Sequence, residues 1–171
     1  DAAACTKCHA AIAAQQQGIK RGVHISTRTV FRLMRNAAGG VQRVVSEETL
    51  PIDNPSVYGF TKGLGERVCQ YFCEHFGMRI IALRITGPRT REAFIAERRT
   101  PIHPGLYVMD EEDLANGIMS SLRVVQTGSS RFDPILLAAD EHEVDHNITK
   151  ARMILGWEPK GHLLLEDDAA S

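Results

Sequence analysis

The chain has 171 residues, of which 24% are charged, and its 20 Lys and Arg residues nearly balance 21 Asp and Glu residues, for a net charge of −1. This balance argues against a basic nucleic-acid surface, and no apolar run approaches the roughly 20 residues of a membrane span. The sequence starts at Asp1 without a charged-then-apolar leader, so we expect a cytoplasmic protein whose true beginning has been trimmed or is missing.

The first half of the sequence predicts a helix, a strand and a second helix. Residues 2–17 are rich in Ala and Gln and predict a helix that a glycine ends. Residues 23–27 predict a short strand with hydroxyl groups at its end, and residues 31–53 look irregular. An Asn-Pro-Ser sequence at residues 54–56 predicts a capped start of a helix that runs to about residue 76.

The second half continues the alternation. Residues 78–85, MRIIALRI, read as a strand buried on both faces, and residues 89–106 look basic and loop-rich. We then expect a short strand, a helix with an acidic first turn, a buried strand and a closing helix, over residues 106–109, 110–126, 134–139 and 147–155. This order predicts one α/β domain over residues 1–171, with a parallel sheet and crossover helices.

The segment CTKCH places Cys5, Cys8 and His9 in the spacing by which c-type haem is attached to a chain. An electron carrier is therefore one hypothesis. The alternative is that these residues lie on one face of the first helix, where small side chains let it pack closely on a sheet. Cys69 and Cys73 are expected to be reduced thiols in the core of the second helix. We expect no metal site.

The most specific chemical signal is the pair Tyr58 and Lys62. Residues four apart lie on the same face of a helix. An ammonium close to a phenol favours the phenolate, and a tyrosine so tuned can exchange a proton with an alcohol or carbonyl. The partner reaction would be hydride transfer, for which a nicotinamide is needed. Taken alone, the same pair could be a solvated Tyr and Lys on a helix surface.

Five segments in a fixed order carry a more specific pattern. They are AAQQQGIKRGVHISTRTVF, EETLPIDNPSVYGFTKGLGERV, FGMRIIALRITGPR, LYVMDEEDLANGI and ITKARMILGWEP. Together they resemble the extended short-chain dehydrogenase/reductases, the NAD-dependent epimerase/dehydratase group, over nearly the whole chain. The resemblance implies a partial doubly wound, Rossmann-like parallel sheet, with residues 89–106 and 140–171 as reduced substrate-side segments.

The resemblance also implies roles for individual residues. Tyr58 would be the acid/base, and Lys62 would hold the nicotinamide ribose and tune Tyr58. Thr27 would orient the substrate oxygen, with Ser26 as the neighbouring alternative and cofactor contact. The loop that follows the predicted strand at residues 78–85 would lie beside the nicotinamide. This loop contains Thr86, Gly87 and Pro88. A basic side chain could meet an anionic group of the substrate, and the candidates are Arg28 and Arg89.

Two departures from the family pattern bear on function. The sequence holds no glycine-rich strand–turn–helix loop of the kind that cradles a pyrophosphate, so the first half of the dinucleotide fold is absent, and NAD cannot be told from NADP. The stretch between Pro88 and Leu106 is short, which favours a small sugar or sugar acid over a nucleotide-sugar. Oxidation, epimerisation and dehydration all stay open.

Two further expectations concern assembly and activity. In relatives, the helices that correspond to residues 2–17 and 56–76 pair across a two-fold axis, so we expect a homodimer and no nucleic-acid or membrane partner. Because half of the cofactor site is missing from the sequence, a non-catalytic binding or regulatory relative is the main alternative to an enzyme.

Overall fold

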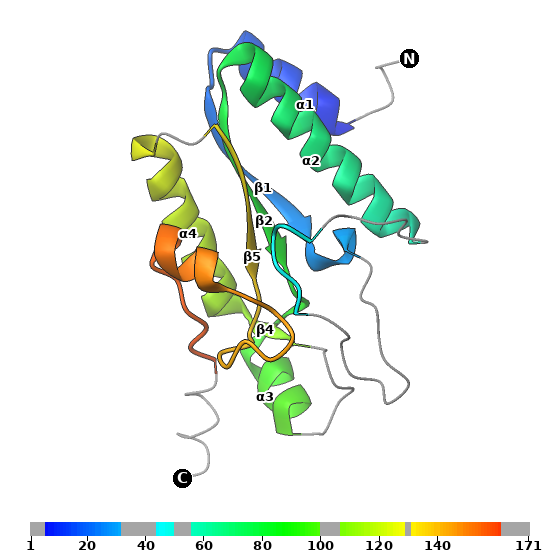
Figure 1. Ribbon diagram of the computed structural model, residues 1–171, viewed down its shortest axis with the longest axis vertical. Coiled ribbons are helices and arrows are strands. Elements are labelled where there is room, and N and C mark those ends of the chain that lie inside the picture. Colours follow the sequence, from blue (N-terminus) through cyan, green and yellow to red (C-terminus); the bar gives the residue numbers. More distant parts are fainter. Residues whose placement is uncertain (1–5, 32–43, 50–55, 100–106, 129–130, 162–171) are drawn as a thin grey trace.

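The computed structural model describes residues 6–31, 44–49, 56–99, 107–128 and 131–161. Its centre is a parallel sheet of three strands, β1 (Arg21–Thr27), β2 (Arg79–Ile85) and β5 (Phe132–Leu137), in the order β1-β2-β5 (Figure 1). The predicted parallel sheet is thereby confirmed. The middle strand β2 is buried on both faces, as its continuous apolar sequence predicts.

Helices cover both faces of this sheet. The helices α1 (Thr6–Gln16) and α2 (Val57–Phe76) lie on one face, and α4 (Glu111–Thr127) lies on the other (Figure 1). Successive residues of β2 serve different sides, because Ile80 packs with Cys73 of α2 whereas Ile81 packs with Val125 of α4. The fold is therefore a three-layer α/β arrangement, as expected.

Caps set the ends of the two long helices. The Ser56 hydroxyl accepts a hydrogen bond from the Gly59 N–H at 3.3 Å, and Gly77 closes α2 with φ of 65°. The cap is thus Ser56 rather than the predicted Asn at residue 54, which lies outside the described residues. Asp110 caps α4 through the Glu112 N–H at 3.1 Å, in line with the predicted acidic first turn.

The region predicted to be loop-rich, residues 89–106, contains a helix instead. Helix α3 (Arg91–Arg99) starts where the Phe94 N–H donates to the Thr90 carbonyl at 2.8 Å, and the Phe94 ring is fully buried. The segment REAFIAERR has good helix formers and no Gly or Pro, so the many arginines misled the prediction. Before α3, β3 (Pro88–Arg89) pairs in parallel with β4 (Met109–Asp110), which starts later than the strand predicted from residue 106.

The closing helix is shorter and wider than predicted. It starts with helical residues 149–150, continues as one π-helical turn, η3 (Ala151–Leu155), and ends at Gly156 with φ of 60°. The following segment is held on α4, because Trp157 Nε1 donates to the Asp113 carbonyl at 2.8 Å. The buried Asp113 carboxylate also accepts the N–H groups of Lys160 and Gly161, each at 2.9 Å. Burial raises the pKa of Asp113.

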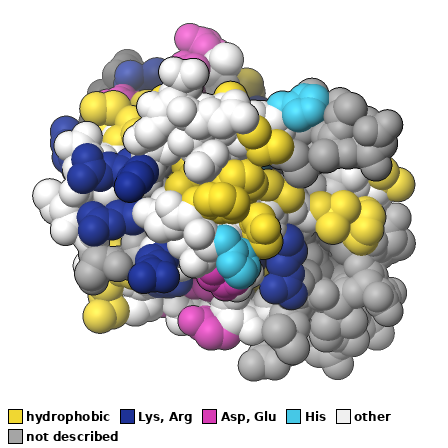
Figure 2. Space-filling model, turned by 90° about the horizontal axis from the view of Figure 1, so that it is seen from above, with side chains coloured by type: hydrophobic (Ala, Val, Ile, Leu, Met, Phe, Trp, Pro, Cys, Tyr) yellow, Lys and Arg dark blue, Asp and Glu magenta, His cyan; other side chains and the backbone are white. Residues whose placement is uncertain are grey.

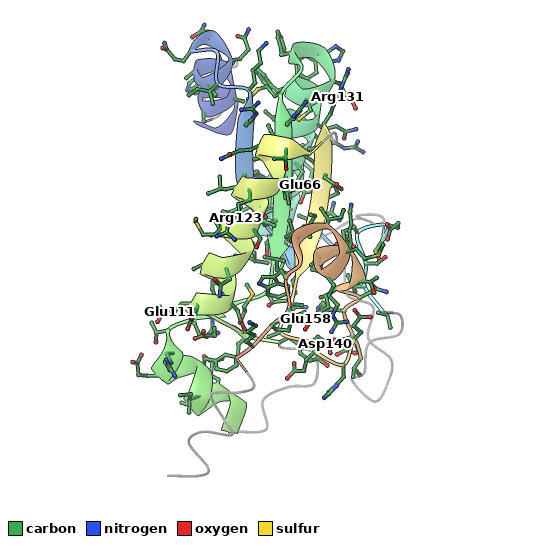
Figure 3. The ribbon with its side chains drawn as sticks, turned by 90° about the vertical axis from the view of Figure 1, so that its left-hand side faces the viewer. Glu66, Glu111, Arg123, Arg131, Asp140 and Glu158 are labelled. Carbon is green, nitrogen blue, oxygen red and sulfur yellow. The ribbon has the colours of Figure 1, made fainter. Side chains whose placement is uncertain are left out.

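The two ends of the sheet differ in charge. A basic residue stands at or directly before the start of each strand of the three-stranded sheet, namely Arg21, Arg79 and Arg131, and Figure 2, which views this end, shows Lys and Arg side chains gathered on one side. Figure 3 places Arg131 at this end and both Glu111 and Asp140 at the opposite end. Each strand follows a helix, so the negative ends of the helix dipoles lie beside the basic residues and account for them. In the described part of the chain, no helix has the length and apolar character of a membrane span.

Candidate active site

Tyr58 and Lys62 lie one turn apart in the first half of α2. The Lys62 ammonium is 5.7 Å from the centre of the Tyr58 ring, in the range of a cation–π contact, so the two side chains share a face as the spacing predicts. Lys62 Nζ also donates a hydrogen bond of 2.9 Å to the carbonyl of Ile25 in β1. Tyr58 is 55% exposed and is accessible to a substrate at the carboxyl ends of the strands.

Thr27 and Ser26, the two candidate hydroxyls, have different surroundings. Thr27 ends β1, and its Oγ1 accepts the Thr29 N–H at 3.3 Å and shares a hydrogen bond of 3.1 Å with the Thr29 hydroxyl. Ser26 is 1% exposed, and its hydroxyl donates to Glu66 Oε1 at 2.5 Å. A cofactor contact by Ser26 would therefore compete with a buried carboxylate, whereas the Thr27 hydroxyl contacts only the N–H and hydroxyl of Thr29 among the described residues. Thr27 remains the predicted substrate-orienting group.

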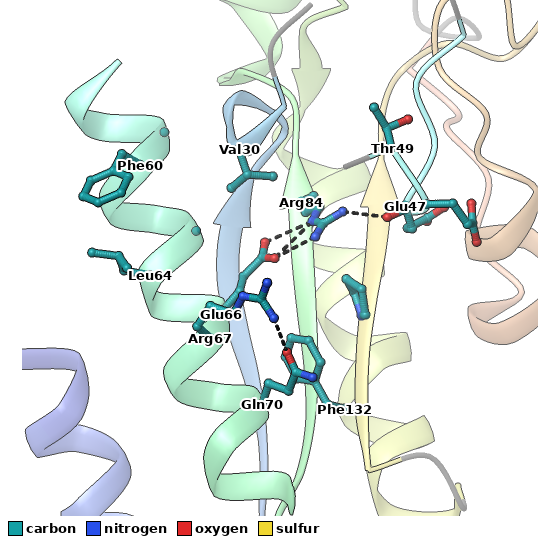
Figure 4. Close-up of a pocket in the computed structure, with 14 residues that line it drawn as sticks. Val30, Glu47, Thr49, Phe60, Leu64, Glu66, Arg67, Gln70, Arg84 and Phe132 are labelled. Atoms are coloured by element: carbon teal, nitrogen blue, oxygen red, sulfur yellow. Dashed lines mark hydrogen bonds and ion pairs between the residues drawn. The ribbon is translucent and has the colours of Figure 1, made fainter. Parts of the chain in front are cut away.

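Glu66, which the sequence analysis did not place in the site, is the centre of a buried polar cluster. It lies one turn after Lys62 and is 6% exposed. Its carboxylate accepts two charge-assisted bonds from Arg84, from Nη2 at 2.8 Å and Nε at 3.0 Å (Figure 4). Arg84 Nη1 donates further to the Glu47 carbonyl at 3.1 Å. The signal for this pair was Arg84 itself, since a charge within a buried strand requires a partner.

A groove of about 570 Å³ lies on the α2 side of the sheet, bounded by α2, β5 and residues 44–49 (Figure 4). Apolar and polar side chains line it, including Phe60, Leu64, Phe132 and the buried ion pair of Glu66 with Arg84. Tyr58 and Lys62 are not among its lining residues. The groove is therefore next to the Tyr–Lys pair rather than the place where the predicted chemistry would occur.

The predicted nicotinamide loop follows β2. Thr86 is buried, its N–H donates to the Leu137 carbonyl at 3.1 Å, and its hydroxyl has no partner among the described residues. The Gly87 carbonyl accepts the Met109 N–H at 3.0 Å, and Pro88 begins β3. A buried hydroxyl without a partner at a strand's carboxyl end fits a polar ligand group, such as the amide of a nicotinamide. The residues present fit this end of the cofactor.

The two predicted substrate arginines lie near this end of the sheet but are not equivalent. Arg28 begins η2 (Arg28–Val30), directly after Thr27. Arg89 forms an ion pair with Glu97 of α3 and donates to the Pro88 carbonyl at 3.1 Å. A substrate carboxylate or phosphate would have to compete with Glu97 for Arg89. Both contacts remain predictions.

The cysteines of the two predicted pairs lie in different segments of the chain. Cys5 is outside the described residues, Cys8 lies in α1, and His9 is exposed on the same helix. Cys69 and Cys73 are both buried in α2, as expected for core thiols. Burial raises the pKa of Cys73 to about 11, so this thiol stays protonated at neutral pH.

Comparison with known proteins identifies the lineage. Residues 7–133 match the family described as "NAD dependent epimerase/dehydratase family". Solved structures with the same fold include a UDP-galactose 4-epimerase, at 21% identity and a TM-score of 0.65, over 90% of this chain and 62% of that one. Comparison with curated proteins gives no match.

Two NAD-bound structures are also similar. One is a UDP-glucuronic acid 4-epimerase from Bacillus cereus, with 20% identity and a TM-score of 0.64, over 90% of this chain and 61% of that one. The other is a short-chain dehydrogenase/reductase superfamily protein from Agrobacterium tumefaciens, with 18% identity and a TM-score of 0.71, over 96% and 70%. The chain thus spans about three fifths of the length of the two epimerases. At these identities the likeness establishes the Rossmann-type fold.

Proposed function

The chain belongs to the NAD-dependent epimerase/dehydratase family, and on that premise we propose that it carries the proton-transfer part of a sugar-oxidising or sugar-epimerising site. The observation that supports this most is the placement of Tyr58 and Lys62 on one face of α2, with the Lys62 ammonium bonded to β1 two residues before Thr27. Three groups that the family uses for proton transfer thereby come from two adjacent elements.

Each of these side chains has a distinct task in the proposed reaction. A bound NAD or NADP supplies the hydride acceptor. In its phenolate form, Tyr58 accepts the proton of a sugar hydroxyl and becomes the phenol, and Thr27 donates or accepts a hydrogen bond at the same oxygen to orient it. Lys62 has three N–H donors, of which Ile25 takes one, so two remain for a ribose hydroxyl and for the region of Tyr58.

We propose a free sugar or a sugar acid as substrate. The segment between β3 and β4 spans residues 90–108 and includes the nine residues of α3, which leaves little chain for a nucleotide-binding insert. Arg28 and Arg89 are two cationic side chains near the carboxyl ends of the strands, and a guanidinium can bind a carboxylate through two parallel hydrogen bonds. One of the similar solved structures is a mutated uronate dehydrogenase, at 19% identity over 91% of this chain.

The proposal is tested by turnover in matched tyrosine variants. The protein is incubated with NAD or NADP and a panel of aldoses and hexuronic acids, and both nicotinamide reduction and sugar epimerisation are followed. Tyr58→Phe is expected to lower the rate by about 100-fold or more, the usual contribution of a general acid–base. Tyr71→Phe changes a similarly exposed tyrosine of the same helix and is expected to leave the rate unchanged. Equal rates for the two variants would refute the proposal.

Binding without turnover is the second candidate function. It is favoured by one observation, that the groove on the α2 side of the sheet is not lined by Tyr58 or Lys62. Titration with NADH combined with the turnover assay separates the two candidates. A non-catalytic relative is expected to bind NADH or the sugar but to show neither nicotinamide reduction nor epimerisation in the turnover assay.

We also propose a homodimer through the helix pair α1 and α2. The outer side of α2 carries large exposed apolar side chains, with Val57, Phe60, Leu64 and Tyr71 all at least half exposed. A stripe of this kind usually marks a protein contact. Leu64→Glu is expected to convert a dimer into a monomer in light scattering, and a wild-type protein that is monomeric at all concentrations would refute this assembly.

A further inference from the structure

We propose that Glu66 is a positioning residue, which holds the Tyr58–Lys62 face of α2 in register with Thr27 by joining Ser26 of β1 to Arg84 of β2. The inference rests on the proposed function for its catalytic consequence. Its geometric content stands on the contacts alone.

The first step is the place of the carboxylate in the sheet. Ser26 and Arg84 are cross-strand partners in the β1–β2 register, and the next pair along is Thr27 with Ile85. Glu66 accepts the Ser26 hydroxyl at 2.5 Å on Oε1 and the Arg84 guanidinium at 2.8 Å on Oε2. One carboxylate therefore links both strands immediately before the residue that is proposed to orient the substrate.

The second step is that α2 makes two separate attachments to the end of β1. Lys62 bonds the Ile25 carbonyl at 2.9 Å, and Glu66, one turn later, bonds the Ser26 hydroxyl. A single attachment would leave the helix free to turn about its contact point. Two attachments one turn apart set both its rotation and its position along the strand, and with them the approach of Tyr58 to Thr27.

The third step is that the cluster is itself held in place. The Arg84 guanidinium lies 4.5 Å from the centre of the Phe31 ring and donates to the Glu47 carbonyl. The side chains of both Glu66 and Arg84 are 8% exposed, so the pair has little water to compete with it. A rigid, dry cluster next to a site can fix the geometry of groups that it does not touch.

The test uses variants that separate positioning from simple stability. Ser26→Ala cuts the link to β1 and keeps the Glu66–Arg84 pair, whereas Glu66→Gln weakens both links. Cys73→Ala removes a fully buried side chain from the other half of α2 and is the control for stability loss. Each variant is studied with NMR of the Lys62 ammonium group, with thermal unfolding, and with kcat and KM under the conditions of the turnover assay.

Ser26→Ala is expected to lower kcat by roughly tenfold and Glu66→Gln by roughly 100-fold, as small displacements of reacting groups do, with a smaller change in KM. In both, the ammonium signal of Lys62 broadens or shifts as its bond to Ile25 loosens. Cys73→Ala keeps the Lys62 signal and kcat at an equal loss of stability. Should Glu66→Gln not fold, Ser26→Ala decides alone.

The inference is overturned if Ser26→Ala or Glu66→Gln retains the wild-type Lys62 signal and kcat, whatever happens to stability. Absence of turnover in the wild-type protein would instead count against the proposed function. In that case the Lys62 signal still decides whether Glu66 sets the position of α2, so the two failures are distinguishable.

Discussion

The two outer strands of the sheet, β5 and β1, differ in the hydrogen-bond partners of the backbone groups that face away from β2. In β5, the Arg131 carbonyl accepts the Ile80 N–H at 2.8 Å, so the outward groups belong to the alternate residues 132, 134 and 136. Pro134 has no N–H, and its carbonyl accepts Lys150 Nζ at 2.9 Å. The Leu136 N–H donates to Glu47 Oε1 at 2.6 Å. These contacts block a further strand at residues 134 and 136 of this edge.

In β1, the Lys20 carbonyl accepts the Arg79 N–H at 2.7 Å, so the odd-numbered residues present their backbone groups outward. The Ile25 carbonyl is bonded to Lys62, but the N–H groups of Val23 and Ile25 have no partner in the described ranges. The strand has no proline, and its arginine, Arg21, stands at its first position. It keeps the features of a strand that can pair on both sides.

The contrast shows that an edge is defined by a few contacts from distant parts of the chain. The outward backbone groups of β5 are removed or bonded by Pro134, Lys150 and Glu47. Lys150 and Glu47 come from other segments of the chain. At the β1 edge, the Ile25 carbonyl is held by Lys62, a residue of the proposed site. The state of this edge and the placement of Lys62 are therefore linked.

The largest expected effect comes from comparing proline substitutions at two neighbouring positions of β1. His24 presents its backbone N–H to β2, so His24→Pro removes a ladder bond and is expected to cost about 3 kcal/mol or more in the free energy of unfolding. Val23→Pro removes only an outward N–H and is expected to cost much less. Chemical denaturation measures both. Equal losses would show that the assigned outward residues are wrong.

On the outer edge of β5, Glu47→Ala leaves the Leu136 N–H without its acceptor. We expect a loss of about 1–3 kcal/mol in the free energy of unfolding, the range for an unsatisfied partly buried donor. Exposed Glu48 is the matched control, and Glu48→Ala is expected to change stability by less than about 0.5 kcal/mol. A Glu47→Ala variant as stable as wild type would mean that this edge is not closed by Glu47.

The pH dependence of stability sharpens the same contact. Burial is the main cause that raises the pKa of Glu47 above 4.5, against the opposing effect of the Leu136 N–H. A raised folded-state pKa means that the fold disfavours the charged form of Glu47. The contribution of the Glu47 protonation equilibrium to the free energy of unfolding is therefore complete below pH 4.5, and it is lost as the pH rises through the folded-state pKa. Denaturation over this window is expected to show a falling wild-type stability relative to Glu47→Gln. A constant difference would contradict it.

The smallest effect is expected for Lys150→Met. Lys150 pairs with Asp133 and bonds Pro134, but its side chain is 26% exposed, so solvent weakens the ion pair. We expect a loss of about 1 kcal/mol or less. The sharper readout is association, because the variant uncovers the Pro134 carbonyl, and static light scattering is expected to show more aggregation than for Lys20→Met at the start of β1.

Strands and long helices were predictable because their signals are local. MRIIALRI is apolar enough to indicate burial on both faces, and Tyr58 and Lys62 are close in space because they are four residues apart. Helix α3 was missed because its arginines resembled a basic loop. Glu66 could not be assigned, since its role depends on Ser26 and Arg84 meeting across two strands. Glu47 could not be assigned either, because its contact with Leu136 joins residues 89 apart.

The proposal that Tyr58 works with Lys62 and Thr27 in hydride-coupled proton transfer is tested most directly by following the hydrogen itself. A sugar or hexuronic acid deuterated at the reacting carbinol carbon is incubated with the protein and oxidised cofactor, and the nicotinamide is analysed by mass spectrometry. We predict deuterium in the nicotinamide with wild type and with Tyr71→Phe, and at least roughly 100-fold slower labelling with Tyr58→Phe. Labelling at equal rates in wild type and Tyr58→Phe, or none with wild type, would contradict the account.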